Sequence, residues 1–331
     1  MSTEGDDRPA LPGWAGLSTL FGTPTVELSA LPRDGVDAIA AGVPFDATAT
    51  SRPGAAEGPE AIRRASRVYA ESAKALGDAE MIDMRTGSTF RYRRPRLVEA
   101  GDVAVYPTDP ERHFASVSAS AAAIAATGAM SVFLGGDHSV SYPLFAGVAR
   151  AWAERDPGAR LAYVQVDHHF DFGDRSLVYG SLYHGSNARR ISELPHVALD
   201  RLAFIGVGDA TRREQLQSLQ RAGSHVVSAA ALRATGPRRA LEPLAEAFDG
   251  ATALYVSVDI DVLDAAQAPG TGNVTGGGLT VPELHDVLDV LKRFRIVAID
   301  VVEVAPRYDP TGRTAQIAAR LLFEFLYRQA V

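Results

Sequence analysis

Three short clusters of aspartate and histidine carry the residue types that bind metal ions. They occupy residues 135–139, 167–171 and 257–261, and their candidate ligands are His138, Asp167, His169, Asp171, Asp259 and Asp261. Each cluster follows an apolar run that is typical of a buried parallel strand. Side chains alternate between the two faces of a strand, so we expect alternate residues of a cluster to point to one side. The clusters should then meet at the carboxyl edge of one sheet, where open α/β proteins place their sites.

A cation would resolve the charge repulsion of this arrangement. Four carboxylates and two imidazoles at one edge would otherwise oppose each other or take up protons. Two divalent ions balance four negative ligands, and mixed oxygen and imidazole donors suit Mn²⁺, Fe²⁺, Co²⁺, Ni²⁺ or Zn²⁺ better than Ca²⁺ or Mg²⁺. An isolated Asp-x-Asp or a lone histidine is more often a turn, a helix cap or a packed side chain. The three clusters together predict a binuclear hydrolytic centre.

Composition narrows the class of protein. The chain has 331 residues, a net charge of −7 and no cysteine, which excludes disulfides and thiolate zinc sites. No basic block favours a nucleic-acid or anionic-membrane partner, and no apolar run reaches transmembrane length. The first residues are polar and acidic and lack the features of a signal peptide. We therefore expect a cytoplasmic enzyme with a small-molecule substrate.

Strand-like and helix-like patterns alternate along most of the chain. We expect strands at residues 36–43, 131–134, 161–166, 202–207, 225–227, 254–256 and 296–302. We expect helices at residues 59–70, 111–126, 140–153, 212–222, 238–248, 282–293 and 314–328. This alternation predicts an α/β fold with a central parallel sheet covered by helices on both faces. Residues 1–34 are expected to form an irregular N-terminal extension, and residues 35–331 a single catalytic domain.

Two segments interrupt the alternation directly after ligand clusters. Residues 171–192 have weak periodicity, and residues 264–278 are rich in Gly, Thr, Pro and Ala. Loops at such positions commonly carry specificity, so we expect both segments to wall the site. Asp137 precedes a candidate ligand, and we expect its carboxylate to support His138.

The motifs resemble those of the ureohydrolases, the family of arginase and agmatinase, in its agmatinase-like branch. Residues 135–139, Gly-Gly-Asp-His-Ser, match the first metal motif of the family. Residues 167–171 match its Asp-Ala-His-x-Asp, with His168 in place of alanine. Residues 257–264 match its Ser-x-Asp-x-Asp-x-x-Asp, and Pro-Gly-Thr-Gly follows at 269–272. Further matches lie at residues 42–46 and 300–306, so the resemblance runs from about residue 36 to the end of the chain.

The resemblance implies a three-layer α/β/α arginase-like fold, two Mn²⁺ ions, and a homo-oligomer of three or six chains. It implies one metal on His138, Asp167, Asp171 and Asp259, and the other on Asp167, His169, Asp259 and Asp261. A hydroxide bridging the metals would attack a guanidinium carbon to give urea and an amine. The resemblance also makes Asp171 the residue that orients this nucleophile, His184 the proton donor, and Glu303 the partner of the guanidinium.

The departures from the family pattern leave several points open. His168 could pack beside the centre or affect metal or substrate directly, and Ni²⁺, Co²⁺ or Zn²⁺ remain alternatives to Mn²⁺. Arg175, Arg189 and Arg190 near His184 favour a carboxylate or a bulky polar tail on the guanidino substrate. The alternatives to a guanidino-compound hydrolase are a formimidoylglutamate-type hydrolase, a free-guanidine hydrolase and a non-catalytic subunit of the same fold.

Overall fold

The central element of the molecule is a parallel sheet of eight strands. The computed structural model describes residues 18–76, 79–156, 158, 160–248 and 252–330. Strand order across the sheet is β4-β1-β5-β10-β9-β6-β7-β8, and all the pairs are parallel. The strands are β1 (Ala38–Gly42), β4 (Leu97–Asp102), β5 (Met130–Leu134), β6 (Arg160–Val166), β7 (Leu202–Val207), β8 (His225–Ser228), β9 (Thr252–Asp259) and β10 (Arg295–Val302).

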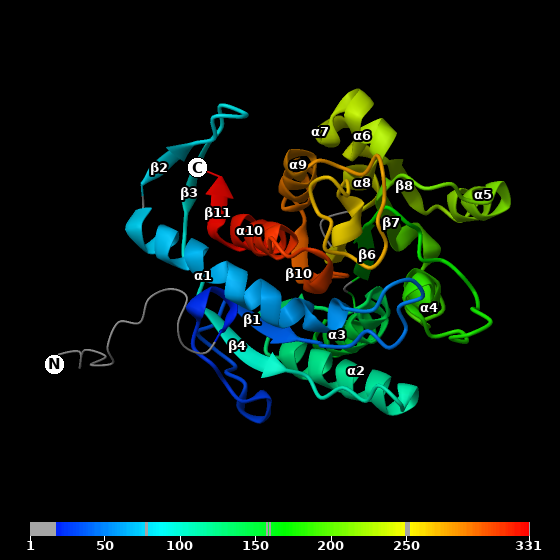
Figure 1. Ribbon diagram of the computed structural model, residues 1–331, viewed down its shortest axis with the longest axis horizontal. Helices are drawn as coiled ribbons and strands as arrows, with labels where there is room; N and C mark the ends of the chain where they lie inside the picture. Colours follow the sequence, from blue (N-terminus) through cyan, green and yellow to red (C-terminus); the bar gives the residue numbers. More distant parts are fainter. Residues whose placement is uncertain (1–17, 77–78, 157, 159, 249–251, 331) are drawn as a thin grey trace.

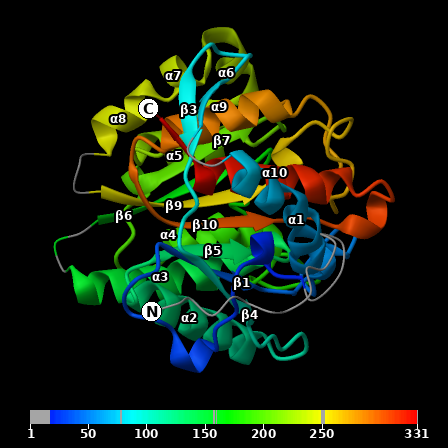
Figure 2. The same cartoon turned by 90° about the vertical axis from the view of Figure 1, so that its left-hand side faces the viewer.

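Helices cover both faces of this sheet and bury its alternating side chains (Figures 1 and 2). One face packs against helices that include α1 (Gly58–Leu76), α6 (Ala229–Thr235), α9 (Val281–Leu291) and α10 (Arg313–Tyr327). The other packs against α2 (Pro110–Ala126), α3 (Ser141–Arg155), α4 (Asn187–Ser192) and α5 (Arg213–Arg221). Neighbouring residues divide between the faces, as Val132 and Phe133 do on β5. The three-layer α/β/α fold predicted from the sequence is confirmed.

One expected helix and one small sheet differ from the prediction. The helix expected at 238–248 is two short helices, α7 (Pro237–Ala240) and α8 (Glu242–Ala247). Pro243 lies in the first turn of α8 and has no N–H to donate to the preceding turn, so a continuous helix cannot form there. Strands β2 (Glu80–Ile82), β3 (Thr89–Tyr92) and β11 (Arg328–Ala330) form an unexpected antiparallel sheet. Its strands are too short to show a clear sequence period.

The segment before β1 is attached to the domain by buried contacts. Leu20 and Phe21 are buried in the core beside α1, and the Leu20 N–H donates to Glu99 on β4 at 2.8 Å. Glu99 also accepts from Arg63 of α1 at 2.7 Å, so one buried carboxylate joins three elements. The predicted extension covers residues 1–34; its first 17 residues lie outside the described part of the chain.

Four adjacent strands end where the expected ligands lie. β5, β10, β9 and β6 are neighbours in the sheet, and the chain continues from their carboxyl ends into His138, Glu303, Asp261 and Asp167. Parallel pairing therefore brings segments separated by more than one hundred positions to one edge. Within the described residues, every helix is too short or too polar to cross a membrane.

Candidate metal centre

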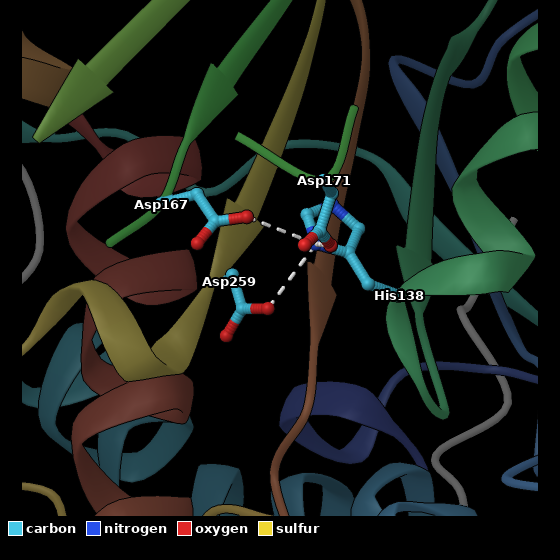
Figure 3. Close-up of side chains that lie close together, drawn as sticks. All are labelled: His138, Asp167, Asp171 and Asp259. Carbon is cyan, nitrogen blue, oxygen red and sulfur yellow. Dashed lines mark ion pairs between the residues drawn. The ribbon is translucent and has the colours of Figure 1, made fainter. Parts of the chain in front are cut away.

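Three of the expected ligands converge on a nitrogen atom of a fourth, His138. The Nδ1 atom of His138 lies 3.2 Å from Asp167, 3.0 Å from Asp171 and 3.1 Å from Asp259, each measured to Oδ2 (Figure 3). His138, Asp167 and Asp259 are buried, and Asp171 is half-buried. The four side chains come from three different strand ends and offer one nitrogen and three oxygen donors to a single point.

The other expected ligands form a second group beside the first. His169 Nδ1 lies 3.4 Å from Asp167 Oδ1 and 3.2 Å from Asp261 Oδ2. Asp167 belongs to both groups, so its two carboxylate oxygens face two neighbouring points. Asp259, expected to be shared as well, belongs by proximity to the first group, and its Oδ1 accepts the Asp261 N–H at 2.8 Å.

The backbone that positions Asp167, His169 and Asp171 is a turn, whereas the prediction was based on the alternation of side chains along a strand. β6 ends at Val166, and residues 167–171 form an irregular turn in place of the expected strand end. Asp171 adopts a left-handed backbone conformation, with φ of 45°. Non-glycine residues seldom occupy this region, and such strain is concentrated at functional sites. The turn therefore aims Asp171 at His138 in a way that the period of a strand could not predict.

The donor set fits divalent cations. His138 Nδ1 is buried and has three carboxylate oxygens nearby, yet it makes no hydrogen bond within the described residues. Burial and the neighbouring charges of Asp261 and Asp167 raise the pKa of Asp259 well above its usual range. Burial and Asp167 likewise raise the pKa of Asp261 to about 7. Positive charge between these groups would keep the carboxylates ionised and give the buried nitrogen a partner.

A buried serine orients His138 from behind. The His138 Nε2 atom is 3.0 Å from Ser257 Oγ, and Ser257 Oγ donates to Asp300 Oδ1 at 2.6 Å. Tyr255 donates to the other oxygen of Asp300, also at 2.6 Å. When Nε2 carries the proton and donates it to Ser257, Nδ1 is unprotonated and its lone pair points toward the carboxylates. A histidine that binds a metal ion through Nδ1 needs this tautomer. We did not predict Asp300 as part of the site; its only signal was its place in the familial segment at 300–306.

A second polar chain holds Asp167. Gln165 Nε2 donates to Asp167 Oδ2 at 2.7 Å, and Asn187 of α4 donates to Gln165 Oε1 at 3.1 Å. Asn187 also donates to the Tyr163 hydroxyl at 2.9 Å. All four residues are buried, so each fixes the orientation of the next. Gln165 stands out in the sequence as the one polar residue of an apolar run, a signal that our prediction did not use.

The expected proton donor and the expected guanidinium partner contact each other. His184 Nδ1 lies 2.9 Å from Glu303 Oε1, and the same oxygen accepts the His138 N–H at 2.9 Å. Burial lowers the pKa of His184, but the hydrogen bond and charge of Glu303 outweigh this effect and raise it to about 9. The Nε2 atom of His184 lies 2.7 Å from the hydroxyl of Thr50, an exposed residue. The Thr50 N–H also donates to His184 Nε2 at 3.1 Å, so this nitrogen is an acceptor here and the ring proton lies on Nδ1, toward Glu303.

Glu303 is held in an unusual backbone conformation. Its φ is 63°, in the left-handed region that a non-glycine residue seldom adopts. Within the described residues, the Glu303 carboxylate forms two hydrogen bonds, both through Oε1, and none through Oε2. The carboxylate is therefore fixed through one oxygen while the second remains available to a planar cation.

Two neighbours of the ligands, Asp137 and His168, lie outside the ligand groups. Asp137 does not contact the His138 ring; its carboxylate accepts from Thr48 at 2.8 Å and from the Ser139 N–H at 3.1 Å. The prediction that it supports His138 is wrong, because its carboxylate faces Thr48 and Ser139 instead. His168 belongs to neither ligand group; its ring packs against Gly208 and edge-on to His169.

Two adjoining cavities, which share lining residues, open beside the centre. The inner cavity, about 180 Å³, is lined by His169 and Asp171 together with Phe170, Val207 and Asp209. The outer one, about 660 Å³, is lined by parts of the expected loop at 171–192 and of residues 210–219. Loop 171–192 therefore walls the cavities as predicted, whereas residues 264–278 line neither of these two.

The fold and the two ligand groups define an α/β protein with a candidate binuclear metal centre. The model of the arginase family matches residues 36–327. The chain is 32% identical over 297 residues to the mitochondrial guanidino acid hydrolase of Homo sapiens, covering 88% of this chain and 78% of that protein. It is 34% identical over 299 residues to the formimidoylglutamase of Halobacterium salinarum, covering 88% of each.

A solved structure agrees with these relatives. Proclavaminate amidinohydrolase from Streptomyces clavuligerus superposes with a TM-score of 0.78 at 28% identity, covering 96% of this chain and 98% of that one. The chain belongs to the arginase family, and the resemblance predicted from its motifs is confirmed. Its curated relatives are named as hydrolases with different substrates at similar identity, so overall similarity does not select a substrate.

Proposed function

We propose that the chain is a metal-dependent amidinohydrolase that converts a guanidino compound and water into urea and an amine. The observation that carries this proposal is the pair of ligand groups sharing Asp167, with Glu303 and His184 directly beside them. His138, Asp167, Asp171 and Asp259 would hold one ion, and Asp167, His169 and Asp261 the other, with Asp259 as the expected second shared ligand. Two bound divalent ions would lower the pKa of water and supply hydroxide near neutral pH.

The protein side chains would then position the substrate and move one proton. The free oxygen of Glu303 accepts N–H groups of the planar guanidinium, which favours carboxylate partners. Asp171 accepts a hydrogen bond from the attacking water and orients it toward the guanidinium carbon. A C–O bond forms, the C–N bond to the substituted nitrogen breaks, and His184 donates the proton that the leaving amine requires. The attacking water loses both protons as urea forms: one restores the protonated His184, and the other ends on the released amine. Glu303 raises the pKa of His184 to about 9, so Nε2 would carry the donated proton once the Thr50 N–H no longer donates to it.

Metal identity, assembly and location remain predictions. Oxygen and imidazole donors support Mn²⁺ in both positions, with Ni²⁺, Co²⁺ and Zn²⁺ as alternatives, because affinity order and cellular supply both decide occupancy. The family resemblance supports a homotrimer or homohexamer, which sedimentation analysis would test. A cytoplasmic location stays an expectation from the sequence.

One experiment tests the reaction. Metal-free protein is reloaded separately with Mn²⁺, Ni²⁺, Co²⁺ or Zn²⁺, and urea is measured with agmatine, guanidino acids, arginine and free guanidine. Asp259→Ala should abolish urea release by removing a carboxylate of the first group. Asp289→Ala on α9, whose carboxylate pairs with Lys292, serves as the matched control and should retain activity. Urea from no compound with any metal would reject the proposal.

A second candidate is a formimidoylglutamate-type hydrolase. The 34% identity to a formimidoylglutamase supports it, and the same ligand groups would serve C–N cleavage of a formimino group. The products differ, because a formimino carbon leaves as formamide and a guanidino carbon as urea. Assaying formamide from formimidoylglutamate in the same reloaded samples separates the two functions.

A further inference from the structure

The two cavities adjoin each other, and the inner one borders the candidate centre. The inner cavity touches His169 and Asp171, whereas the outer cavity touches none of the six proposed ligands. Five residues line both cavities, namely Phe172, Gly173, Ala210, Thr211 and Gln215. Glu303 lines neither cavity, but Asp171, which would orient the attacking water, lines the inner one. A substrate that reacts beside Asp171 would therefore extend its tail from the inner into the outer cavity. The outer volume of about 660 Å³ lies within the range of small-molecule pockets.

The charged side chains that line the outer cavity are mostly positive. Arg175, Arg189 and Arg212 contribute three cations, against the single carboxylate of Asp174. Asp174 is neutralised by Arg190 at 3.0 Å, and Arg189 pairs with Glu193 at 2.8 Å.

Two of these arginines have no internal partner. Among the described residues, the guanidinium groups of Arg175 and Arg212 make no ion pair or hydrogen bond. Arg212 occupies the N-cap position of α5 without a side-chain capping hydrogen bond, and the helix dipole is positive at this end. Two exposed guanidinium groups at the rim of a cavity are suited to bidentate contact with a carboxylate.

We propose that the outer cavity binds a carboxylate, so that the chain prefers guanidino acids over guanidino amines. Resting on the proposed function, this inference assigns the class of substrate tail and names Arg175 and Arg212 as the residues that select it. An amine tail of the same length would bring a like charge to both arginines. An amine tail would instead need a carboxylate partner. Asp209, which lines only the inner cavity, is the candidate for that contact.

The test compares tails that differ only in charge. Urea release is measured with 5-guanidinopentanoate, with agmatine, which has the same methylene chain, and with the neutral amide of the acid. The variants are Arg175→Glu and Arg212→Glu, with Arg221→Glu as the control. Arg221 lies at the other end of α5, outside the lining of both cavities, and gives the same change in net charge.

The inference predicts opposite shifts for the two charged tails. Each cavity variant should raise KM for the acid about tenfold, as expected for loss of one charged contact, with little change in kcat. The same variants should lower KM for agmatine and leave KM for the amide unchanged, and Arg221→Glu should behave as the wild type. A wild-type preference for agmatine that is lost in Asp209→Asn would overturn the inference, and so would an acid KM that neither cavity variant alters.

An absence of urea release would be a separate outcome from a failure of the carboxylate inference. If no compound yields urea, the proposed function fails, and calorimetric titration of the full chain with the acid and with agmatine then tests the cavity directly. Tighter binding of the acid, weakened in Arg212→Glu but not in Arg221→Glu, would support the carboxylate site. Equal binding of both compounds would reject it.

Discussion

At the scale of single residues, Ser257 decides which nitrogen of His138 faces the carboxylates. Its hydroxyl lies between His138 Nε2 and Asp300 and is fully buried. Removing it leaves both groups without that partner, a loss that costs more than the hydrogen bond itself. The proposed ligand would then lose the contact that fixes its tautomer and ring orientation.

We expect Ser257→Ala to weaken metal binding by about tenfold to a hundredfold, the usual effect of removing a partner behind a ligand. Calorimetric metal titration measures the change. Ser131→Ala is a matched control, because Ser131 is a buried β5 serine whose hydroxyl has no hydrogen-bond partner in the described structure. Equal metal affinity in the two variants would contradict the role given to Ser257.

The contact between His184 and Glu303 predicts a pH dependence with a definite sign. Burial lowers the pKa of His184, but Glu303 raises it overall from 6.5 to about 9. Because the folded value exceeds the unfolded one, the stabilisation is complete below pH 6.5 and is lost as pH rises through about 9. The protonated donor disappears over the same range.

Two measurements follow from this shift. The kcat of the wild type should fall above about pH 9, and His184→Gln should lower kcat by about 10²–10⁴ and lose that pH limb. The difference in unfolding free energy between wild type and His184→Gln should also shrink between pH 6.5 and 9. A kcat profile of the same shape in both proteins would show that His184 is not the donor.

At the scale of elements, His168 joins the turn after β6 to the loop after β7. The Gly208 N–H donates to the His168 carbonyl at 3.0 Å, and a Cβ on Gly208 would lie 2.3 Å from the His168 ring. His168 is buried against this glycine, so the histidine that departs from the family pattern fills the space that the missing side chain leaves. The structure favours packing over metal binding for this residue.

Gly208→Ala should therefore destabilise the protein by about 1–3 kcal/mol through overpacking. The same substitution in a His168→Ala background should cost much less, since the ring that it meets is gone. Urea denaturation of the wild type, the two single variants and the double variant measures this coupling. Additive effects would show that the ring and the loop do not constrain each other.

At the scale of the whole molecule, the candidate centre joins segments that are distant in the sequence. Its six proposed ligands lie at or just after the carboxyl ends of β5, β6 and β9. Metal bound to them would link these strand ends in the folded state alone. A ligand that binds only the folded state stabilises it, by about 4 kcal/mol at a concentration one thousand times its Kd.

We expect Mn²⁺ to raise the Tm of the wild-type protein measurably, and to raise that of Asp259→Ala much less. Differential scanning calorimetry with and without Mn²⁺ provides the comparison, with Asp289→Ala again as the control. An equal increase in all three proteins would place the metal effect outside the proposed centre.

The sequence by itself determined the sheet, its helical layers and the identity of the candidate ligands. These features depend on local patterns: apolar runs that end in carboxylate and imidazole groups, and alternating helix and strand periods. The prediction that the three clusters meet needed only the rule that parallel strands share a carboxyl edge.

Only the tertiary structure decided how those groups are oriented and supported. Ser257 meets Asp300 because β9 and β10 pair in a register that places them opposite each other, and register is set by packing across the whole sheet. Asp171 faces His138 through a left-handed turn, and no period predicts such a turn. Thr50 reaches His184 across 134 positions of sequence. Such contacts are non-local, so they exist only after the chain has closed around its core.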